Sequence, residues 1–267
     1  MAGVPDIVSH RCAAEVNPYL LIAGAGLLAG IMNALAGGGT FVTLPALISV
    51  GIPSVQANAS STVGLVPGSA ASAWAYRDGL GPVGTVPLRP LLLVSVMGGI
   101  GGALLLLWTP TRVFDRLLPW LLAIATLALI FGRPLGERLR RRVHIKPPAV
   151  LCMQFALGVY GGYFGGAVGI MMLAVWGLLD DRDIKSLNAS RTLVVMAMNL
   201  MAVIVFVFAG LVRWRETVVL LVAAIAGGYF GAQLGRRASA AMVRVGTLII
   251  AAGITLLFFV RTYGHVP

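Results

Sequence analysis

Charged residues are scarce in this chain of 267 residues, and acidic residues are the scarcest of them. Asp, Glu, Lys and Arg together make up 11% of the sequence, with 9 acidic against 20 basic side chains, while 58% of the residues are hydrophobic. A typical soluble domain carries about 25% charged residues. The chain therefore lacks the polar residues needed to cover a water-exposed surface, which excludes a soluble globular protein.

The residue types that most often catalyse reactions or bind metals are also few, and they avoid the apolar segments. The three histidines, His10, His144 and His265, lie in the tails and in a polar connection, and no Asp or Glu lies well inside an apolar run. Cys12 and Cys152 do not have the spacing of a disulfide framework or a zinc site. We therefore expect no enzyme activity, no catalytic residues, no cofactor and no metal. A proton relay through membrane-embedded side chains is also hard to build.

Long apolar runs, in contrast, are abundant. Runs of roughly 18 to 24 residues recur along the chain, and a helix of that length crosses a hydrocarbon core of about 30 Å. The runs are continuously apolar and do not alternate as the strands of a membrane barrel do. The sequence therefore predicts an all-α, polytopic membrane protein with the lipid bilayer as its surroundings.

The formal net charge of +11 comes from basic residues in the connections between apolar runs. The densest group lies in residues 133–146, near the middle of the chain. Basic loops accumulate on the cytoplasmic side of membranes, beside acidic lipid. This explains the charge without a nucleic-acid partner, which we do not expect, and it predicts that the central connection is cytoplasmic.

The second half of the chain repeats landmarks of the first half in the same order. Both halves contain Asn-Ala-Ser-x-Thr, beginning at Asn58 and at Asn188. Glycine motifs flank both copies. Before the motif, Leu28-Ala29-Gly30 and Gly37-Gly38 in the first half correspond to Ala156-Leu157-Gly158 and Gly165-Gly166 in the second. After the motif, Gly98-Gly99 and Gly102-Ala103 correspond to Gly227-Gly228 and Gly231-Ala232. Internal duplication of this kind is typical of secondary transporters.

The duplication predicts two homologous transmembrane halves. The expected parts are an N-terminal tail (1–18), a first repeat (19–133), a basic linker (134–147), a second repeat (148–261) and a C-terminal tail (262–267). The first apolar run ends like a signal-peptide cleavage site, but its recurrence in the second half places it in the mature protein. The expected helical segments are 19–36, 40–50, 54–76, 88–108 and 113–132, then 148–164, 167–179, 187–210, 216–235 and 240–260.

The orientation of the two halves depends on how often each crosses the membrane. An odd number of crossings per half would place 14 of the 20 Lys and Arg residues on one side. If each glycine-interrupted pair is one kinked crossing instead, that total is 12. The positive-inside rule thus favours inverted repeats with glycine-broken or re-entrant helices by a narrow margin, with parallel repeats as the alternative.

The glycine triplet Gly37, Gly38 and Gly39 exceeds what helix packing needs. It predicts an unwound stretch, which at membrane depth must be satisfied by protein or by a watery cavity. The helix that follows points its free N–H groups and a partial positive charge at that place. We predict a substrate site here, or alternatively a simple packing kink, with these residues: Asn33, Gly37, Gly38, Gly39, Thr40, Gly165 and Gly166. Close packing of membrane helices explains other glycines: Gly98, Gly99, Gly102, Gly227, Gly228 and Gly231.

The repeated motif adds small polar side chains at the start of an apolar run. The candidate substrate-binding residues here are Asn58, Ser60, Ser61, Thr62, Asn188, Ser190, Arg191 and Thr192; N-capping of a helix is the alternative for the uncharged ones. The two copies differ where Ser61 corresponds to Arg191. An arginine in an apolar run is costly unless it is paired, and an anionic substrate could be that partner. A side chain that snorkels to the interface is the alternative.

These landmarks resemble the sulfite/sulfonate exporter family of TauE/SafE-like membrane permeases. The resemblance rests on residues 30–39 (Gly-Ile-Met-Asn-Ala-Leu-Ala-Gly-Gly-Gly), 58–62 and 74–77 (Trp-Ala-Tyr-Arg) and on their second-half echoes, and it covers nearly the whole chain. Ala167 departs from the pattern, since it stands where the first half has Gly39.

The resemblance implies a multi-pass permease of the bacterial inner membrane. Its substrate would be a small organosulfur or carboxylate anion, such as sulfite, a sulfonate or sulfoacetate, usually carried outwards. A passive anion channel and a non-transporting membrane scaffold are the alternatives, and a homodimer is compatible with the sequence.

Overall fold

The computed structural model describes residues 17–35, 38–140, 146–176, 184–235 and 240–264. Within these ranges the chain is helical, without β-strands apart from one isolated bridge between Val83 and Val86. The all-α class predicted from the sequence is confirmed. The helices are α1 (Pro18–Leu35), α2 (Thr40–Ser49), α3 (Ser54–Ala75), the short 3-10 helix η1 (Arg77–Gly79), α4 (Leu88–Trp108), α5 (Thr111–Arg140), α6 (Pro147–Phe164), α7 (Val168–Trp176), α8 (Ile184–Phe208), α9 (Trp214–Gly235) and α10 (Ala240–Tyr263).

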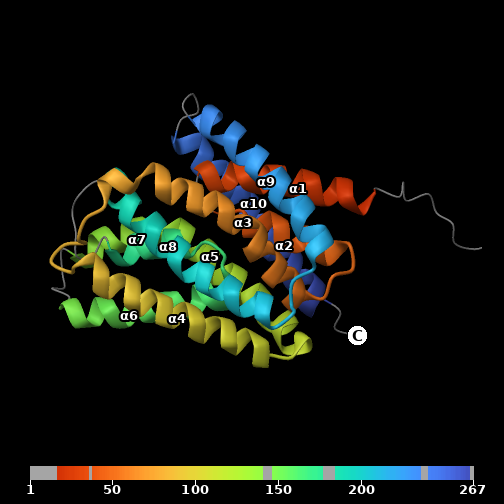
Figure 1. Cartoon of the computed structure of the whole chain (residues 1–267), viewed down its shortest axis with the longest axis horizontal. Helices are drawn as coiled ribbons and strands as arrows, with labels where there is room; N and C mark the ends of the chain where they lie inside the picture. The colour runs from red at the N-terminus through yellow and green to blue at the C-terminus, as the bar shows by residue number, and fades with distance from the viewer. Residues whose placement is uncertain (1–16, 36–37, 141–145, 177–183, 236–239, 265–267) are drawn as a thin grey trace, which may run out of the picture.

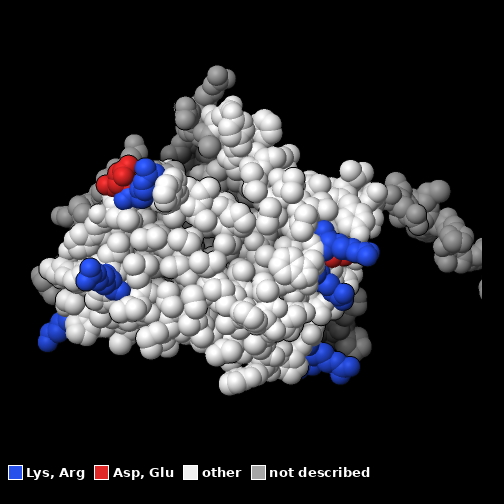
Figure 2. Space-filling view, in the orientation of Figure 1, with Lys and Arg blue, Asp and Glu red and all other residues white. Residues whose placement is uncertain are grey.

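Each expected helical segment is present as a helix, with one notable difference in length. α5 continues past Gly132 to Arg140, so the start of the expected linker is helical. In the described part of the chain, four helices contain stretches that are long and apolar enough to cross a membrane: Leu88–Trp108, Thr111–Gly132, Ala189–Phe208 and Val245–Tyr263. On the face that Figure 2 shows, charged side chains gather towards the two ends of the long axis and leave the middle free. This distribution fits a body that crosses a bilayer along that axis.

Helices far apart in the sequence pack closely against each other, α1 against α9 and α4 against α6 (Figure 1). Glycine allows both approaches: a Cβ on Gly30 would overlap Ala224 O of α9, and one on Gly102 would overlap Val159 O of α6. The predicted packing role is confirmed at the following residues: Gly98, Gly99, Gly102, Gly227 and Gly231. At Gly228 a Cβ would have room.

The pattern of helix contacts occurs twice. The helices α1–α5 of the first half correspond in order to α6–α10 of the second half. The contact α1–α9 then corresponds to α6–α4, α3–α9 to α8–α4, and α2–α10 to α7–α5. All six contacts are present. The matched helices α3 and α8 also pack against each other and run in opposite directions. Ser60 near the start of α3 bonds to Arg213, beyond the end of α8, while Ser190 near the start of α8 bonds to Gly81, beyond the end of α3.

The largest buried apolar cluster fixes the positions of the short helices. It includes Phe41 of α2, Phe114 of α5, Phe164 at the end of α6 and Phe206 of α8, each almost completely buried. Burying a phenylalanine side chain contributes about 1.5–3 kcal/mol. The ends of α6 and α2 are therefore anchored by side chains from both halves of the chain.

Candidate functional site

The first helix break lies between α1 and α2, where the glycine triplet predicts it. The side-chain oxygen of Asn33 accepts hydrogen bonds from the backbone amides of Gly38 (3.1 Å) and Gly39 (2.9 Å). Gly39 lies so close to α1 that a Cβ would stand 2.8 Å from Ala29 O. Gly37 lies outside the described residues, and Thr40 is buried at the start of α2. The predicted break is confirmed, and Asn33 satisfies its free amides from within the protein.

The polar side chains of the first Asn-Ala-Ser-x-Thr copy lie inside a helix and not at its end. α3 begins at Ser54 after Pro53, with no side-chain cap, and α8 begins at Ile184. The N-capping interpretation is therefore wrong for both copies, because the residues preceding them are already helical. The copy in α3 is almost fully buried at the following residues: Asn58, Ser60, Ser61 and Thr62.

The hydroxyl groups of this copy connect α3 to its neighbours. Ser61 shares a hydrogen bond with Thr43 of α2, and Ser60 accepts one from the backbone amide of Arg213 at 2.9 Å. Thr62 donates to the carbonyl of Asn58 at 2.9 Å, within its own helix. Ser60 and Ser61 thus hold α3 against α2 and against the α8–α9 connection.

The second break lies between α6 and α7 and differs from the first in its backbone. Gly165 has φ +74°, which suits glycine, but Ala167 has φ +55°, a conformation that costs a residue with a Cβ about 1–2 kcal/mol. Strained residues of this kind are concentrated at functional sites. Gly161 occupies the position that corresponds to Asn33. Within the described residues, no side chain bonds to the amides of Gly165 or Gly166.

The first copy of the motif contacts this second break directly. The side-chain amide of Asn58 donates to the carbonyl of Tyr163 at 2.9 Å. Thr62 lies beside Gly165, since a Cβ placed there would be 3.1 Å from the Thr62 hydroxyl oxygen. The side-chain oxygen of Asn58 is buried and has no hydrogen-bond partner. Residues from the two halves of the chain are therefore brought together here.

The second copy of the motif combines structural contacts with an arginine whose Nε has no hydrogen-bond partner in the described part of the chain. Ser190 donates to Gly81 O (2.7 Å) and accepts from Gly81 N (3.1 Å), which ties α8 to the segment after α3. Thr192 is buried, and the side chain of Asn188 lies outside the described residues. Ser190 resembles Ser60 in serving as an anchor between elements.

Arg191 reaches across to the first turn of α7. Its Nε is buried and has no hydrogen-bond partner, and its Nη1 is 3.5 Å from the position that a Cβ on Gly169 would take. This path towards α7 argues against an arginine that snorkels to the interface.

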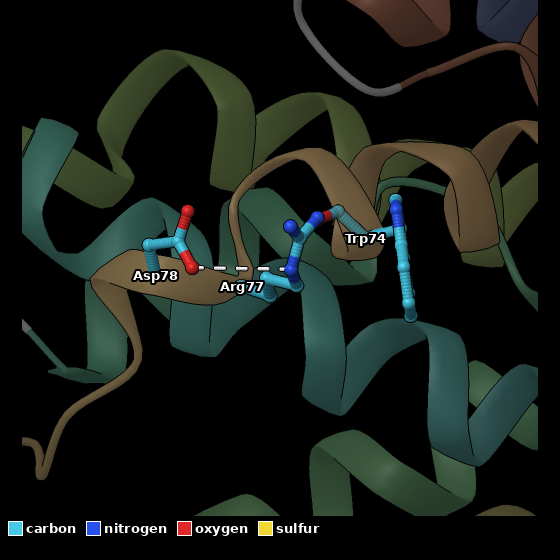
Figure 3. A network of polar contacts seen from close by, with 3 residues as sticks. All are labelled: Trp74, Arg77 and Asp78. Carbon is cyan, nitrogen blue, oxygen red and sulfur yellow. Dashed lines mark hydrogen bonds and ion pairs between the residues drawn. The ribbon is translucent and has the colours of Figure 1, made fainter.

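No carboxylate compensates Arg191 in the part of the chain that the structure describes. The ion pair found there is Arg77–Asp78 (3.8 Å), an exposed contact on η1. Figure 3 shows this pair with the Arg77 guanidinium over the ring of Trp74, 4.5 Å from its centre. The Trp-Ala-Tyr-Arg motif is therefore a surface feature at the end of α3.

Sequence reasoning missed two groups that complete the second break. The carbonyl of Tyr163 accepts from Asn58, and Gly169 leaves room for the guanidinium of Arg191. No pattern in the sequence singles out a backbone carbonyl. Gly169 could have been found as a small residue one turn into the helix that follows the break.

Comparison with known proteins agrees with this architecture. Residues 22–258 match the family described as sulfite exporter TauE/SafE. The chain belongs to this family. It is 26% identical over 252 residues to the probable membrane transporter protein YfcA of Escherichia coli K12, and this match covers 94% of this chain and 93% of that protein. It is 30% identical over 215 residues to the probable membrane transporter protein ORF9 of Sinorhizobium sp., covering 80% of each.

A third relative, a probable membrane transporter protein of Haemophilus influenzae, is 26% identical over 227 residues, covering 85% of this chain and 88% of the relative. No solved structure matches the chain. The family resemblance noted in the sequence is confirmed. This TauE/SafE protein is a membrane protein of a transporter family and not an enzyme.

Proposed function

We propose that this TauE/SafE protein is a permease for a small anion in the bacterial inner membrane. The substrate would be an organosulfur anion such as sulfite, a sulfonate or sulfoacetate. The observation that carries the proposal is the buried Nε of Arg191, which has no hydrogen-bond partner. An isolated charge inside a membrane protein is costly and marks a functional site by default. A bound anion would supply the missing acceptor.

The surroundings of Arg191 favour an oxyanion in particular. A guanidinium presents a planar fork of donors that matches two oxygens of a sulfonate, sulfite or carboxylate. The N-terminus of α7, which Arg191 approaches at Gly169, adds a partial positive charge and free amides. Both features attract an anion to the same place.

The two breaks are unequal, and we place the anion at the second. At the first break, the side chain of Asn33 already occupies the amides of Gly38 and Gly39. At the second, the corresponding position is Gly161, and Arg191 replaces the hydroxyl of Ser61. The protein would then hold one anion per chain and not two. A homodimer would have one site in each copy.

We further propose that the halves are inverted repeats. The antiparallel packing of α3 and α8 supports this, because matched helices of parallel repeats run in the same direction. Inverted repeats place discontinuous helices around a site near the bilayer midplane, and alternating access follows from the movement of one repeat against the other. The two broken pairs would then enter the membrane from opposite sides.

Flux in proteoliposomes tests the transport proposal. Vesicles loaded with radiolabelled sulfite should release it in a saturable manner, and sulfoacetate or a simple sulfonate should compete. Arg191→Ser, which copies the residue of the first half, should abolish this flux. Arg89→Ser removes an exposed arginine from α4 and should leave the flux nearly unchanged.

Two results would contradict the proposal in different ways. Flux that rises without saturation would indicate a passive anion channel. No flux and no binding of any anion tested, in a protein that is folded, would indicate a membrane scaffold.

A further inference from the structure

The side-chain oxygen of Asn58 is a buried acceptor for which the described part of the chain provides no donor. Asn58 is only 1% exposed, and leaving a buried polar group without a partner costs free energy. A bound ligand or an ordered water molecule would supply the missing partner. Because the group is an acceptor, the ligand must be a cation or a hydrogen-bond donor, and an anion is excluded.

The orientation of the Asn58 amide is fixed by its neighbour. Its nitrogen donates to the carbonyl of Tyr163. Rotating the amide by half a turn would set two acceptor oxygens against each other and lose that bond. The side-chain oxygen of Asn58 is therefore the atom left free, beside the end of α6.

The end of α6 supplies further oxygens of the same kind. The last four carbonyls of a helix have no partner within it, and a helix C-terminus carries a partial negative charge that favours cations. The carbonyl of Gly161 lies 3.7 Å from the position that a Cβ on Gly165 would take. Thr62, one helical turn after Asn58, lies at the same residue with its hydroxyl proton donated to Asn58 O. The lone pairs of that hydroxyl thus remain available.

We propose that this place binds a monovalent alkali cation, with Na⁺ as the expected ion. The ligands would be the Asn58 side-chain oxygen, the Thr62 hydroxyl and carbonyls at the end of α6. All of them are neutral oxygens, whereas Ca²⁺ and Mg²⁺ sites depend on carboxylates. Within the described residues there is no cluster of acidic, histidine or cysteine side chains that could hold a metal.

A consequence for transport rests on the function proposed above. The same helix break would hold a cation at the C-terminus of α6 and an anion at the N-terminus of α7. Each charge would offset part of the other, so that the pair could move with less net charge than the anion alone. Cation binding itself does not depend on transport, and it can be tested separately.

Thermal unfolding of the purified protein in choline chloride, with NaCl, KCl or LiCl replacing choline at constant chloride, tests the site. A selective and saturable rise of the melting temperature with one alkali cation is expected, because a ligand that binds only the folded state stabilises it. The result on the unmodified protein does not depend on any variant. Equal melting temperatures in all the salts, choline included, would overturn the proposal and leave the Asn58 oxygen to a buried water molecule.

A pair of matched threonine variants tests the ligands. Thr62→Val should weaken cation binding at least about tenfold, since bonds to charged groups contribute about 1.5–3 kcal/mol. Thr217→Val removes an equivalent hydroxyl, which is also buried and donates to the carbonyl four residues earlier, and should leave cation binding unchanged. Equal effects of the two substitutions on the cation affinity would overturn the assignment of Thr62.

Arg191→Ser separates the two proposals. It should retain the cation-induced shift while losing the response to anions. If the variant loses the anion response and the cation response was never present, the anion site stands and the cation site is wrong. A cation response in a protein that binds no anion would show that the cation site stands and the anion site is wrong.

Discussion

Replacing Asn33 by alanine removes the oxygen that holds the first helix break together. That oxygen accepts two amide hydrogen bonds, from Gly38 at 3.1 Å and Gly39 at 2.9 Å, and both glycines are buried. A net loss of about 0.5–1.5 kcal/mol per bond gives about 1–3 kcal/mol in total. The two amides remain buried and unpaired, so we expect the upper part of this range.

The loss is measured as the change in the free energy of unfolding in detergent, against two controls. Asn33→Asp keeps an acceptor oxygen and adds a charge that the start of α2 favours, so it should be much less damaging. Asn17→Ala removes one exposed bond to Tyr19 N at the start of α1 and should cost at most about 1 kcal/mol. Equal losses for Asn33→Ala and Asn17→Ala would refute the reasoning. Asn33→Ala should also retain anion binding, because the proposed anion site lies at the other break.

Three further predictions concern the packing and the second break, and thermal unfolding tests each of them. Ala167→Gly should stabilise the protein by about 1 kcal/mol, because φ at this residue is +55° and a Cβ is unfavourable there. A loss of stability would contradict the inference that the backbone of Ala167 is strained. Gly102→Ala should destabilise the protein strongly, because the added Cβ would overlap a backbone carbonyl of α6. The control Gly101→Ala places its Cβ where nothing lies within 4 Å, so it should be neutral or stabilising by up to about 1 kcal/mol. Similar effects of the two substitutions would be inconsistent with the close approach of α4 to α6. Gln154→Leu should cost about 1–3 kcal/mol, because it leaves the buried Trp176 N–H without its acceptor at 2.9 Å; an unchanged melting temperature would disprove that dependence.

The sequence was sufficient to predict that each helix exists but insufficient to predict where every helix ends. Continuous apolar runs and glycine breaks predicted each segment, because membrane depth allows few other structures. α5 exceeded its apolar run and continued through Pro134 and Gly136 to Arg140, although both residues disfavour a helix; hydropathy marks where a helix leaves lipid but not where it ends. α3 begins at Ser54, after Pro53, where the expected segment 54–76 begins, and ends at Ala75.

The residues of the proposed site stood out in the sequence, but the contacts between them did not. Small polar side chains in an apolar run indicated Asn58 and Arg191 as unusual. The contact between Asn58 and Tyr163 spans 105 positions in sequence, and local patterns carry no information about such a distance. The role of Asn33 was also hidden, because an asparagine that binds substrate and one that caps its own helix break look the same in sequence.

The central claim is that the Nε of Arg191, which has no hydrogen-bond partner in the described part of the chain, is kept free so that the guanidinium can bind an anion. The most direct test compares the melting temperatures of the unmodified protein and Arg191→Ser, each with and without sulfite or sulfoacetate. We predict that the variant is more stable than the unmodified protein when no anion is present, since it removes a partly buried guanidinium whose Nε has no hydrogen-bond partner, and that it no longer responds to the anion. A variant that is less stable without ligand and still shows the full anion-induced shift would contradict the account, because Arg191 would then serve the fold and not the substrate.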